Sequence, residues 1–364
     1  MRSGIVAFDF DGTKMSDPTR DDVYSYVQSI FQRGLVVVVG SGASCALGLP
    51  GMPALAAYLV AEVPLRSGAL PSGSLASWRE VAEALDAGRG LEETLLTVSV
   101  PEDLAVVVTE AIADCVLAAE QRAIAGVLTD TSISAFGRLM LFALQGTPAL
   151  DVVTTNYDRL VEVHAARAGV RVDSTFYGHT VGRFDPLLSR EELLQMQRSS
   201  GRGRKSSVSQ RAHIRLSKPH GSLDWYSRDN QHYRSDLPLG GSRRIVAPGG
   251  NKYRLGYEVP FDVHRARANE AIDKASALLF IGYGFNDDHL QTHIVERIAH
   301  VPTVIVSKEL TDQAHEHLKL NSSAVGIESG VDTNESRVTR GLNSITVEKP
   351  LWDLEHLVKE VLAS

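Results

Sequence analysis

The sequence is poor in cysteine, in long apolar runs and in positive charge, and each shortage excludes a class of protein. Its 364 residues contain only two cysteines, Cys45 and Cys115, too few for a four-cysteine zinc site or a disulfide framework. No apolar run approaches the ~20 residues that span a bilayer. The formal net charge of −7 argues against a dedicated nucleic-acid-binding protein. We therefore expect no zinc and no membrane association.

The amino terminus also lacks the pattern of a signal peptide. Arg2 is followed by a short apolar run that soon reaches Asp9 and Asp11. Hydrophobic residues make up 43% of the chain and charged residues 22%, which is typical of a globular protein. We expect a cytoplasmic protein with one large domain or two ordinary ones.

Strand and helix patterns alternate along most of the chain. "LVVVV" at 35–39 is a continuous β-branched run, typical of a strand buried on both faces. Four later strand patterns each lead toward a helical pattern: "DVVTT", "ALLFIG", "TVIVS" and "SITVEK". This alternation predicts an α/β fold with a Rossmann-like, doubly wound and mostly parallel sheet.

Three segments interrupt or flank this alternation. Residues 50–146 carry only helical patterns and predict a helical module inserted after the first strand–helix unit. Residues 198–211, "RSSGRGRKSSVSQR", are basic and rich in serine and glycine, which predicts a flexible surface loop; a contact with nucleic acid stays open there. Residues 1–20 are interpreted as an amino-terminal arm, and residues 21–364 as one domain.

Four loops are candidate ligand-binding sites, because ligands of open α/β sheets bind beyond the carboxyl ends of the strands. They are "GSGAS" at 40–44, "TTNYD" at 154–158, "KPHG" at 218–221 and "GYGFNDD" at 282–288. Small residues before a helix allow a phosphate to approach backbone N–H groups. Each loop taken alone is also compatible with ordinary turn or capping chemistry.

Together and in this order, the four loops resemble the NAD-binding domain of sirtuins. The resemblance covers roughly residues 21–310 and is strongest to the divergent sirtuin-like domains that consume NAD+ in bacterial antiphage defence. It implies that the glycine loop and later strand ends bind NAD+, through Gly40, Ser41, Gly42, Ser44, Thr155, Gly282, Tyr283 and Ser307. It also implies that Asn156 and Asp158 orient the nicotinamide ribose and that His220 is the catalytic base.

Two departures from the protein deacylases qualify this resemblance. Deacylases continue the glycine loop with G-I-P-D-F-R, whereas this chain has "GLPGMP" at 48–53. They also carry a four-cysteine zinc module after the H-G pair, and no cysteine follows Cys115 here. We therefore expect NAD+ as a substrate without acyl-lysine chemistry.

The expected reaction is hydrolysis of NAD+ to nicotinamide and ADP-ribose. Cleavage of the N-glycosidic bond passes through an oxocarbenium-like state, and its leaving group is already cationic, so the enzyme must mainly orient the ribose and deliver water. Histidine titrates near neutral pH, which suits His220 to the role of base. The resemblance implies control by a homo-oligomeric assembly or by a partner, such as a hexameric, HerA-like DNA-translocase-type ATPase or another defence protein.

Two alternatives remain open. The site could bind NAD+ or ADP-ribose without turnover, as a regulatory subunit. Alternatively, "FDFDGT" at 8–13 resembles the nucleophile loop of haloacid dehalogenase-type phosphatases, with Asp9 as nucleophile and Asp11 as acid/base. In that family a later G-D-G-x-N-D motif helps to hold magnesium, but "GYGFND" has Tyr283 in place of its first Asp. Lys274 also lies closer to that motif than the family's supporting lysine.

Overall fold

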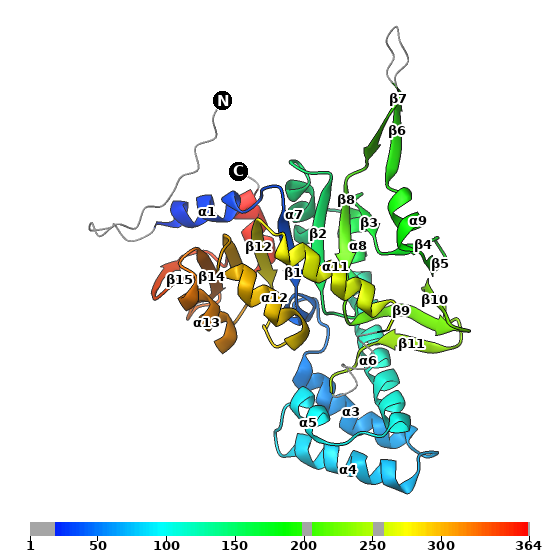
Figure 1. The fold of residues 1–364 in the computed structure, drawn as a ribbon. Helices are drawn as coiled ribbons and strands as arrows, with labels where there is room; N and C mark the ends of the chain where they lie inside the picture. The colour runs from blue at the N-terminus through cyan, green and yellow to red at the C-terminus, as the bar shows by residue number, and fades with distance from the viewer. Residues whose placement is uncertain (1–18, 199–205, 250–257, 363–364) are drawn as a thin grey trace.

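The computed structural model describes residues 19–198, 206–249 and 258–362, and a nine-stranded sheet lies at its centre (Figure 1). In spatial order its strands are β16 (Asn343–Val347), β15 (Ser336–Arg340), β14 (Ala324–Ser329), β13 (Thr303–Val306), β12 (Ala277–Ile281), β1 (Leu35–Val39), β2 (Ala149–Thr154), β8 (His213–Ser217) and β3 (Arg171–Asp173). The seven strands from β14 to β3 run parallel. β15 and β16 continue the β14 edge in antiparallel orientation.

Helices cover both faces of this sheet, because its central strands are buried on both sides. In β1, Val37 packs toward one face and Val36 toward the other. The first face is covered by α1 (Arg20–Ser29), α7 (Ala135–Ala143), α8 (Leu160–Arg167), α14 (Leu354–Leu357) and the π-helical turn η1 (Val358–Leu362). The opposite face is covered by α11 (Phe261–Asp273), α12 (Asp288–Ile298) and α13 (Asp312–Leu320). The predicted doubly wound, mostly parallel fold is confirmed.

A helical module with its own core lies between the glycine-loop helix α2 (Ser41–Cys45) and α7. It consists of α3 (Met52–Arg66), α4 (Ser72–Asp86), α5 (Leu91–Thr97) and α6 (Glu102–Thr129). Leu59, Trp78 and Ile112 are buried in its core. In Figure 1, α3, α4 and α5 gather below the sheet.

The expected extent of the insertion, to residue 146, is too long at its carboxyl end. α7 packs on the main sheet, where Phe136, Leu139 and Met140 join the core around β1 and β2. The spacing of apolar residues predicts this helix, but such spacing identifies only the apolar face of a helix and not the surface on which it packs.

A second, antiparallel sheet has no counterpart in the sequence interpretation. Its order is β11 (Ser242–Ile245), β9 (Gly221–Arg228), β10 (Gln231–Ser235), β5 (Val181–Phe184) and β4 (Phe176–Tyr177). Phe176, Trp225 and Phe261 form a small aromatic core against it, with ring centroids 5.1 Å apart for the first pair. The short helix α9 (Pro186–Glu191) follows β5.

The predicted flexible loop at 198–211 is wrong for part of its length. β6 (Leu194–Arg198) and β7 (Ser206–Gln210) form an antiparallel ladder in which Met196 is paired with Val208. The sequence gives little sign of these strands because few of their side chains are apolar, and backbone hydrogen bonds between the strands form the ladder. Residues 199–205 lie outside the described residues, as do residues 1–18 with Asp9 and Asp11.

The structure also bears on the final strand–helix repeat and on membrane-spanning helices. The strand at 343–347 belongs to an antiparallel hairpin, so the final βα repeat suggested by "SITVEK" does not extend the parallel sheet. Among the described helices, none is long and apolar enough to span a membrane.

Candidate active site

The order of the strands places a crevice at the carboxyl ends of β1 and β12. The chain leaves β1 toward β2 on one side and leaves β12 toward β13 on the other, so the two neighbouring strands end at a topological switch point. The loops that follow them are residues 40–44 and 282–287. A cleft opens between these loops, the β2–α8 loop, the β8–β9 turn and the helical module.

Three glycines allow the two central loops to pack directly on each other. Gly40 N–H donates to the carbonyl oxygen of Ile281 and Gly42 N–H to that of Gly282, both at 2.9 Å. A Cβ atom at Gly40 would lie 2.4 Å from the Gly282 carbonyl oxygen, and Gly282 has a φ of +58°. Gly42 and Gly282 belong to this contact between the loops and do not line the cleft.

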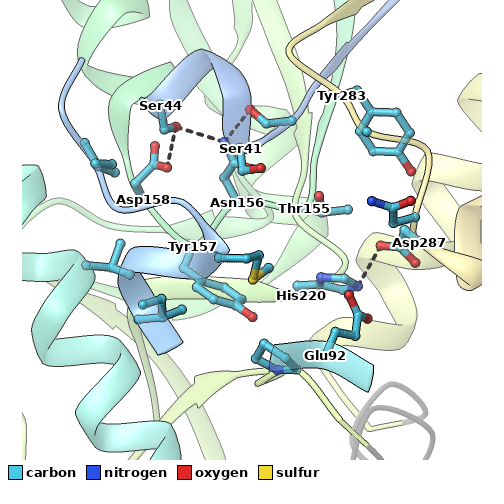
Figure 2. Close-up of a pocket in the computed structure, with 18 of the residues that line it drawn as sticks. Ser41, Ser44, Glu92, Thr155, Asn156, Tyr157, Asp158, His220, Tyr283 and Asp287 are labelled. Atoms are coloured by element: carbon cyan, nitrogen blue, oxygen red, sulfur yellow. Dashed lines mark hydrogen bonds and ion pairs between the residues drawn. The ribbon is translucent and has the colours of Figure 1, made fainter. Parts of the chain in front are cut away.

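A hydrogen-bond relay ties the glycine loop to the β2–α8 loop (Figure 2). The Asn156 amide donates to Gly40 O and to Ser44 Oγ, each at 2.9 Å, and Ser44 Oγ–H donates to Asp158 Oδ2 at 2.7 Å. Both amide hydrogens of Asn156 are thereby used, so its carbonyl oxygen is the atom available to a ligand. The relay fixes these two side chains relative to the loop.

Burial gives Asp158 an unusual electrostatic environment. Its side chain is 4% exposed, and desolvation raises the pKa of the carboxyl, although Lys218, the Ser44 hydroxyl and the Leu160 N–H oppose that rise. Leu160 N–H donates to Asp158 Oδ1 at 3.1 Å, at the start of α8. Asp158 is therefore a relay residue whose carboxyl group is held inside the protein.

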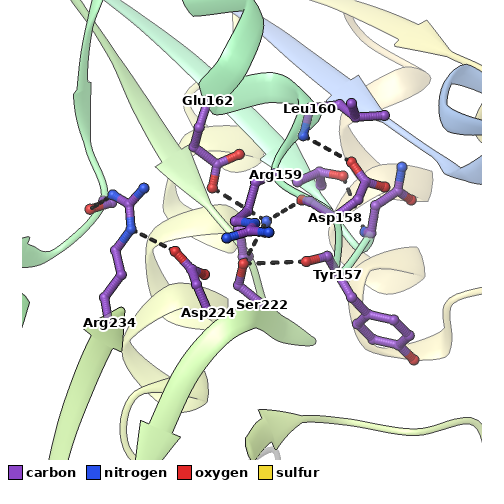
Figure 3. Close-up of polar contacts among 12 residues, drawn as sticks. Tyr157, Asp158, Arg159, Leu160, Glu162, Ser222, Asp224 and Arg234 are labelled. Carbon is purple, nitrogen blue, oxygen red and sulfur yellow. Dashed lines mark hydrogen bonds and ion pairs between the residues drawn. The ribbon is translucent and has the colours of Figure 1, made fainter. Parts of the chain in front are cut away.

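Behind the relay, the buried Lys218 connects it to the segment that carries His220. Three residues that contact its ammonium, Asp158, Glu162 and Ser222, are labelled in Figure 3. Lys218 is 1% exposed; its ammonium donates to the carbonyl oxygen of Asp158 and, at 3.0 Å, to Ser222 Oγ. Glu162 lies 3.4 Å from the same nitrogen and balances its charge. A buried lysine is costly unless its donors are satisfied, so this arrangement holds the two loops in a fixed relation.

His220 lies at the floor of the cleft on a tight turn between β8 and β9. Gly221, the first residue of β9, has a φ of +81°, and a Cβ there would lie 2.1 Å from the carbonyl oxygen of Arg244. Only glycine therefore lets β9 approach β11 immediately after His220. His220 Nε2 lies 2.9 Å from Asp287 Oδ2 across the cleft, and both residues are buried.

The helical module forms the remaining wall of the cleft. From it come Leu49, Pro50, Met52, Leu55, Glu92 and Val116, which are apolar apart from Glu92. The Glu92 side chain reaches toward the imidazole of His220 in Figure 2. Tyr157 and Tyr283 line the cleft beside these groups, and burial raises the pKa of both phenols.

The structure brings together most of the residues expected in a site. Those lining the cleft are Gly40, Ser41, Ser44, Thr155, Asn156, Asp158, His220 and Tyr283. Ser307 does not line it: it follows the next strand, β13, and its N–H donates to the carbonyl oxygen of Ile327. The site therefore draws on β1, β2, β8 and β12 rather than on β13.

The two acidic residues that line the cleft besides Asp158, Glu92 and Asp287, are not in the expected set. Asp287 belongs to the "GYGFNDD" loop, but residue types alone do not predict which polar side chain of this loop points into the cleft. Glu92 comes from the helical module, and no local signal placed that module over the cleft. Within residues 19–198, 206–249 and 258–362, no group of three or more histidine, cysteine or acidic side chains could hold a metal ion.

One known family matches the part of the chain that carries most of the site. The model of the SIR2-like domain matches residues 151–325, which include three of the four site loops. This segment of the chain, just under half of its length, is therefore similar to the SIR2-like domain. The match supports the expected NAD-related enzymatic function. The glycine loop at 40–44 lies before the matched segment.

Solved structures of Sir2 proteins are similar to the chain at low identity. A Sir2 homologue mutant in complex with 2'-O-acetyl ADP-ribose is 14% identical, with a TM-score of 0.42 over 81% of this chain and 88% of that chain. A structure described under the mechanism and regulation of Sir2 enzymes is also 14% identical, with a TM-score of 0.40 over 81% and 89%. No curated protein sequence matches the chain.

Proposed function

We propose that this SIR2-like domain is an NAD+ glycohydrolase that cleaves NAD+ to nicotinamide and ADP-ribose. The observation that carries the proposal is the convergence of the Asn156–Ser44–Asp158 relay and His220 on one cleft at the switch point of the sheet. These polar groups are of the kinds that can orient a ribose and activate water, and they lie on loops that follow strands of the sheet, which supports the proposal.

In the proposed reaction, protein groups act on a substrate whose leaving group is already cationic. The Asn156 carbonyl oxygen, left over by the relay, accepts a hydrogen bond from the nicotinamide carboxamide or the ribose. His220 takes a proton from a ribose hydroxyl or from the attacking water. Carboxylates around the cleft, including Glu92 and Asp287, favour the positive charge that develops on the ribose.

The apolar wall of the helical module supports water as the acceptor. Leu49, Met52 and Leu55 line the same cleft as the glycine loop. A wall of this kind restricts access for a large acceptor, whereas water needs only a small path. Acyl-lysine peptides are therefore included in the test as a competing acceptor.

The test is a product analysis on the purified chain. We expect NAD+ to yield equal amounts of nicotinamide and ADP-ribose, separated by chromatography, with no dependence on an acyl-lysine peptide. His220→Ala and Asn156→Ala should reduce nicotinamide release at least ~100-fold. The matched control is His179→Ala, an exposed histidine outside the cleft, which should retain wild-type rates.

Binding of NAD+ should be measured by calorimetry on the same samples. Tight binding without products, at low and high protein concentration, would favour the regulatory-subunit alternative. Nicotinamide release that requires the peptide would identify a deacylase. Unchanged release in His220→Ala would remove the proposed mechanism.

We further propose that the activity depletes NAD+ during antiphage defence, under the control of homo-oligomeric assembly or of a partner such as a HerA-like ATPase. Unregulated hydrolysis would exhaust the NAD+ of the host cell. Cells expressing the chain, alone or with such an ATPase, should lose NAD+ after phage infection and yield fewer plaques. Cells expressing His220→Ala should do neither. Equal plaque counts with both chains would contradict the defence role.

A further inference from the structure

Two buried side chains from distant segments meet at the floor of the cleft. His220, after β8, and Asp287, before α12, bring Nε2 and Oδ2 to 2.9 Å, and the residues are 8% and 6% exposed (Figure 2). The two atoms are at ion-pair distance without the alignment of a hydrogen bond. Such loose geometry is common in active sites before substrate binds.

The backbone directs Asp287 toward this position. Phe285 is buried with a φ of +60°, a left-handed conformation that turns the chain between Gly284 and α12. The carbonyl oxygen of Asp287 then accepts the N–H groups of Leu290 and Gln291, at 3.1 Å each, so the residue sits at the first turn of the helix. Its side chain is thereby placed against His220.

A carboxylate here has a chemical consequence for the imidazole. A neutral histidine carries one N–H, and the nitrogen that faces a carboxylate is the one that keeps the proton. An Nε2–H tautomer leaves the lone pair on Nδ1. That nitrogen is then the basic atom.

We propose that Asp287 is the positioning residue of His220: it fixes the Nε2–H tautomer and the orientation of the ring, so that Nδ1 acts as the base. The kinetic part of this inference rests on the proposed hydrolase, whereas the tautomer is a property of the free protein. Glu92 is the rival carboxylate, because it lines the same cleft and reaches toward the imidazole.

The first test is spectroscopic and needs no substrate. Protein labelled with ¹⁵N at its 12 histidines is observed at pH 8, above the ordinary titration range of histidine, and His220 is assigned by its loss in His220→Gln. We expect the Nε2–H pattern in the wild type. Asp287→Asn keeps a residue that caps helices well, removes the charge, and should produce a mixed or Nδ1–H pattern.

A matched control exists on the surface of the molecule. Asp273 Oδ1 lies 2.7 Å from His293 Nδ1, and both side chains are about a third or more exposed. Asp273→Asn should change the resonances of His293 and leave those of His220 unchanged. Glu92→Gln should also leave the His220 tautomer unchanged; if it alters the tautomer while Asp287→Asn does not, the role belongs to Glu92.

The second test separates catalysis from binding. Asp287→Asn should lower kcat for nicotinamide release by about 10- to 100-fold, with a change in KM below about threefold. Asp273→Asn should retain both constants. Loss of affinity at constant kcat would contradict a positioning role.

The two hypotheses fail in different ways. An Nδ1–H pattern in the wild type, or a tautomer indifferent to Asp287→Asn, overturns the inference even if His220→Ala abolishes hydrolysis. Conversely, an Nε2–H tautomer that depends on Asp287, in a protein that binds NAD+ but releases no nicotinamide, supports the inference and contradicts the hydrolase.

Discussion

At the scale of single residues, His164 couples the stability of the fold to pH. Its imidazole on α8 is 7% exposed, and burial together with nearby Arg167 lowers its pKa to about 4. Its Nδ1 lies 2.8 Å from Ser134 Oγ, which also accepts the N–H of Gly137 as the cap of α7. The serine hydroxyl can donate to the neutral imidazole, and burial is the main reason why the protonated form is disfavoured.

This burial predicts a loss of stability in mild acid. In the unfolded chain His164 has its ordinary pKa of about 6.5 and binds a proton below that pH. In the folded protein it binds a proton only below about pH 4. The unfolded state is therefore favoured progressively as pH falls from 6.5 toward 4, by about 2 kcal/mol between pH 7 and pH 5. Urea unfolding of the wild type and of His164→Asn, at both pH values, measures the difference.

Asparagine can accept the Ser134 hydroxyl hydrogen as Nδ1 does and does not titrate. His164→Asn should therefore lose less stability on acidification, whereas the exposed His179→Asn should behave like the wild type. Equal acid sensitivity of the wild type and His164→Asn would show that other groups govern this transition.

Residues of the candidate site differ in how far the sequence could predict their positions. Asn156, Asp158 and His220 follow strand patterns directly, and parallel strands bring their carboxyl ends to one edge. Asp287 depends on the left-handed turn at Phe285, which no residue-type rule predicts, since such a conformation is rare outside glycine. Glu92 depends on how a separate module docks, which is decided by packing over long sequence distances.

At the scale of elements, the contact between the β1 and β12 loops leaves no room for a side chain. A Cβ at Gly40 would lie 2.4 Å from the Gly282 carbonyl oxygen and 2.5 Å from Tyr283 Cα, and both obstacles are backbone atoms. Gly40→Ala should therefore force the loops apart and lower the free energy of unfolding by about 3 kcal/mol. Affinity for NAD+ should fall as well, because Ser44 and Tyr283 stand on the displaced loops.

Gly126 provides a control, because the same substitution there should raise the free energy of unfolding instead of lowering it. It lies in the exposed interior of α6, where an added Cβ would meet nothing within 4 Å. Gly126→Ala should raise the free energy of unfolding by about 0.5–1 kcal/mol without changing NAD+ affinity. Urea unfolding and calorimetric titration measure both; a Gly40→Ala protein as stable as the wild type would contradict the packing argument.

Element type was more predictable than element placement. The continuous apolar runs of β1 and β12 predict buried parallel strands, and both lie at the centre of the sheet. α7 was recognisable as a helix, yet its contact with the main sheet was not. The sequence does not predict the antiparallel sheet around Trp225, because its strands lack an alternation of buried apolar and exposed polar residues. In Gly221–Arg228, for example, the polar Ser222 and Asp224 are buried.

At the scale of the whole molecule, one buried ion pair joins the helical module to the site. Glu120 on α6 is fully buried, and its carboxylate accepts hydrogen bonds from the backbone N–H and the guanidinium of Arg159. Arg159 directly follows Asp158 and also pairs with Asp236 at 2.6 Å. A shift of α6 relative to the sheet would therefore act on the β2–α8 loop.

Weakening this junction should affect stability and substrate binding together. Glu120→Gln removes the buried charge that pairs with the Arg159 guanidinium and leaves the exposed Asp236 as its ion-pair partner, which should lower the free energy of unfolding by about 3 kcal/mol. Glu62→Gln is the control: its pair with Arg66 on α3 is partly exposed, so the cost should stay below about 1 kcal/mol. Calorimetry below the unfolding transition should also show several-fold weaker NAD+ binding for Glu120→Gln alone. Equal effects of the two substitutions would mean that the module folds against the sheet without this pair and does not communicate with the cleft through Arg159.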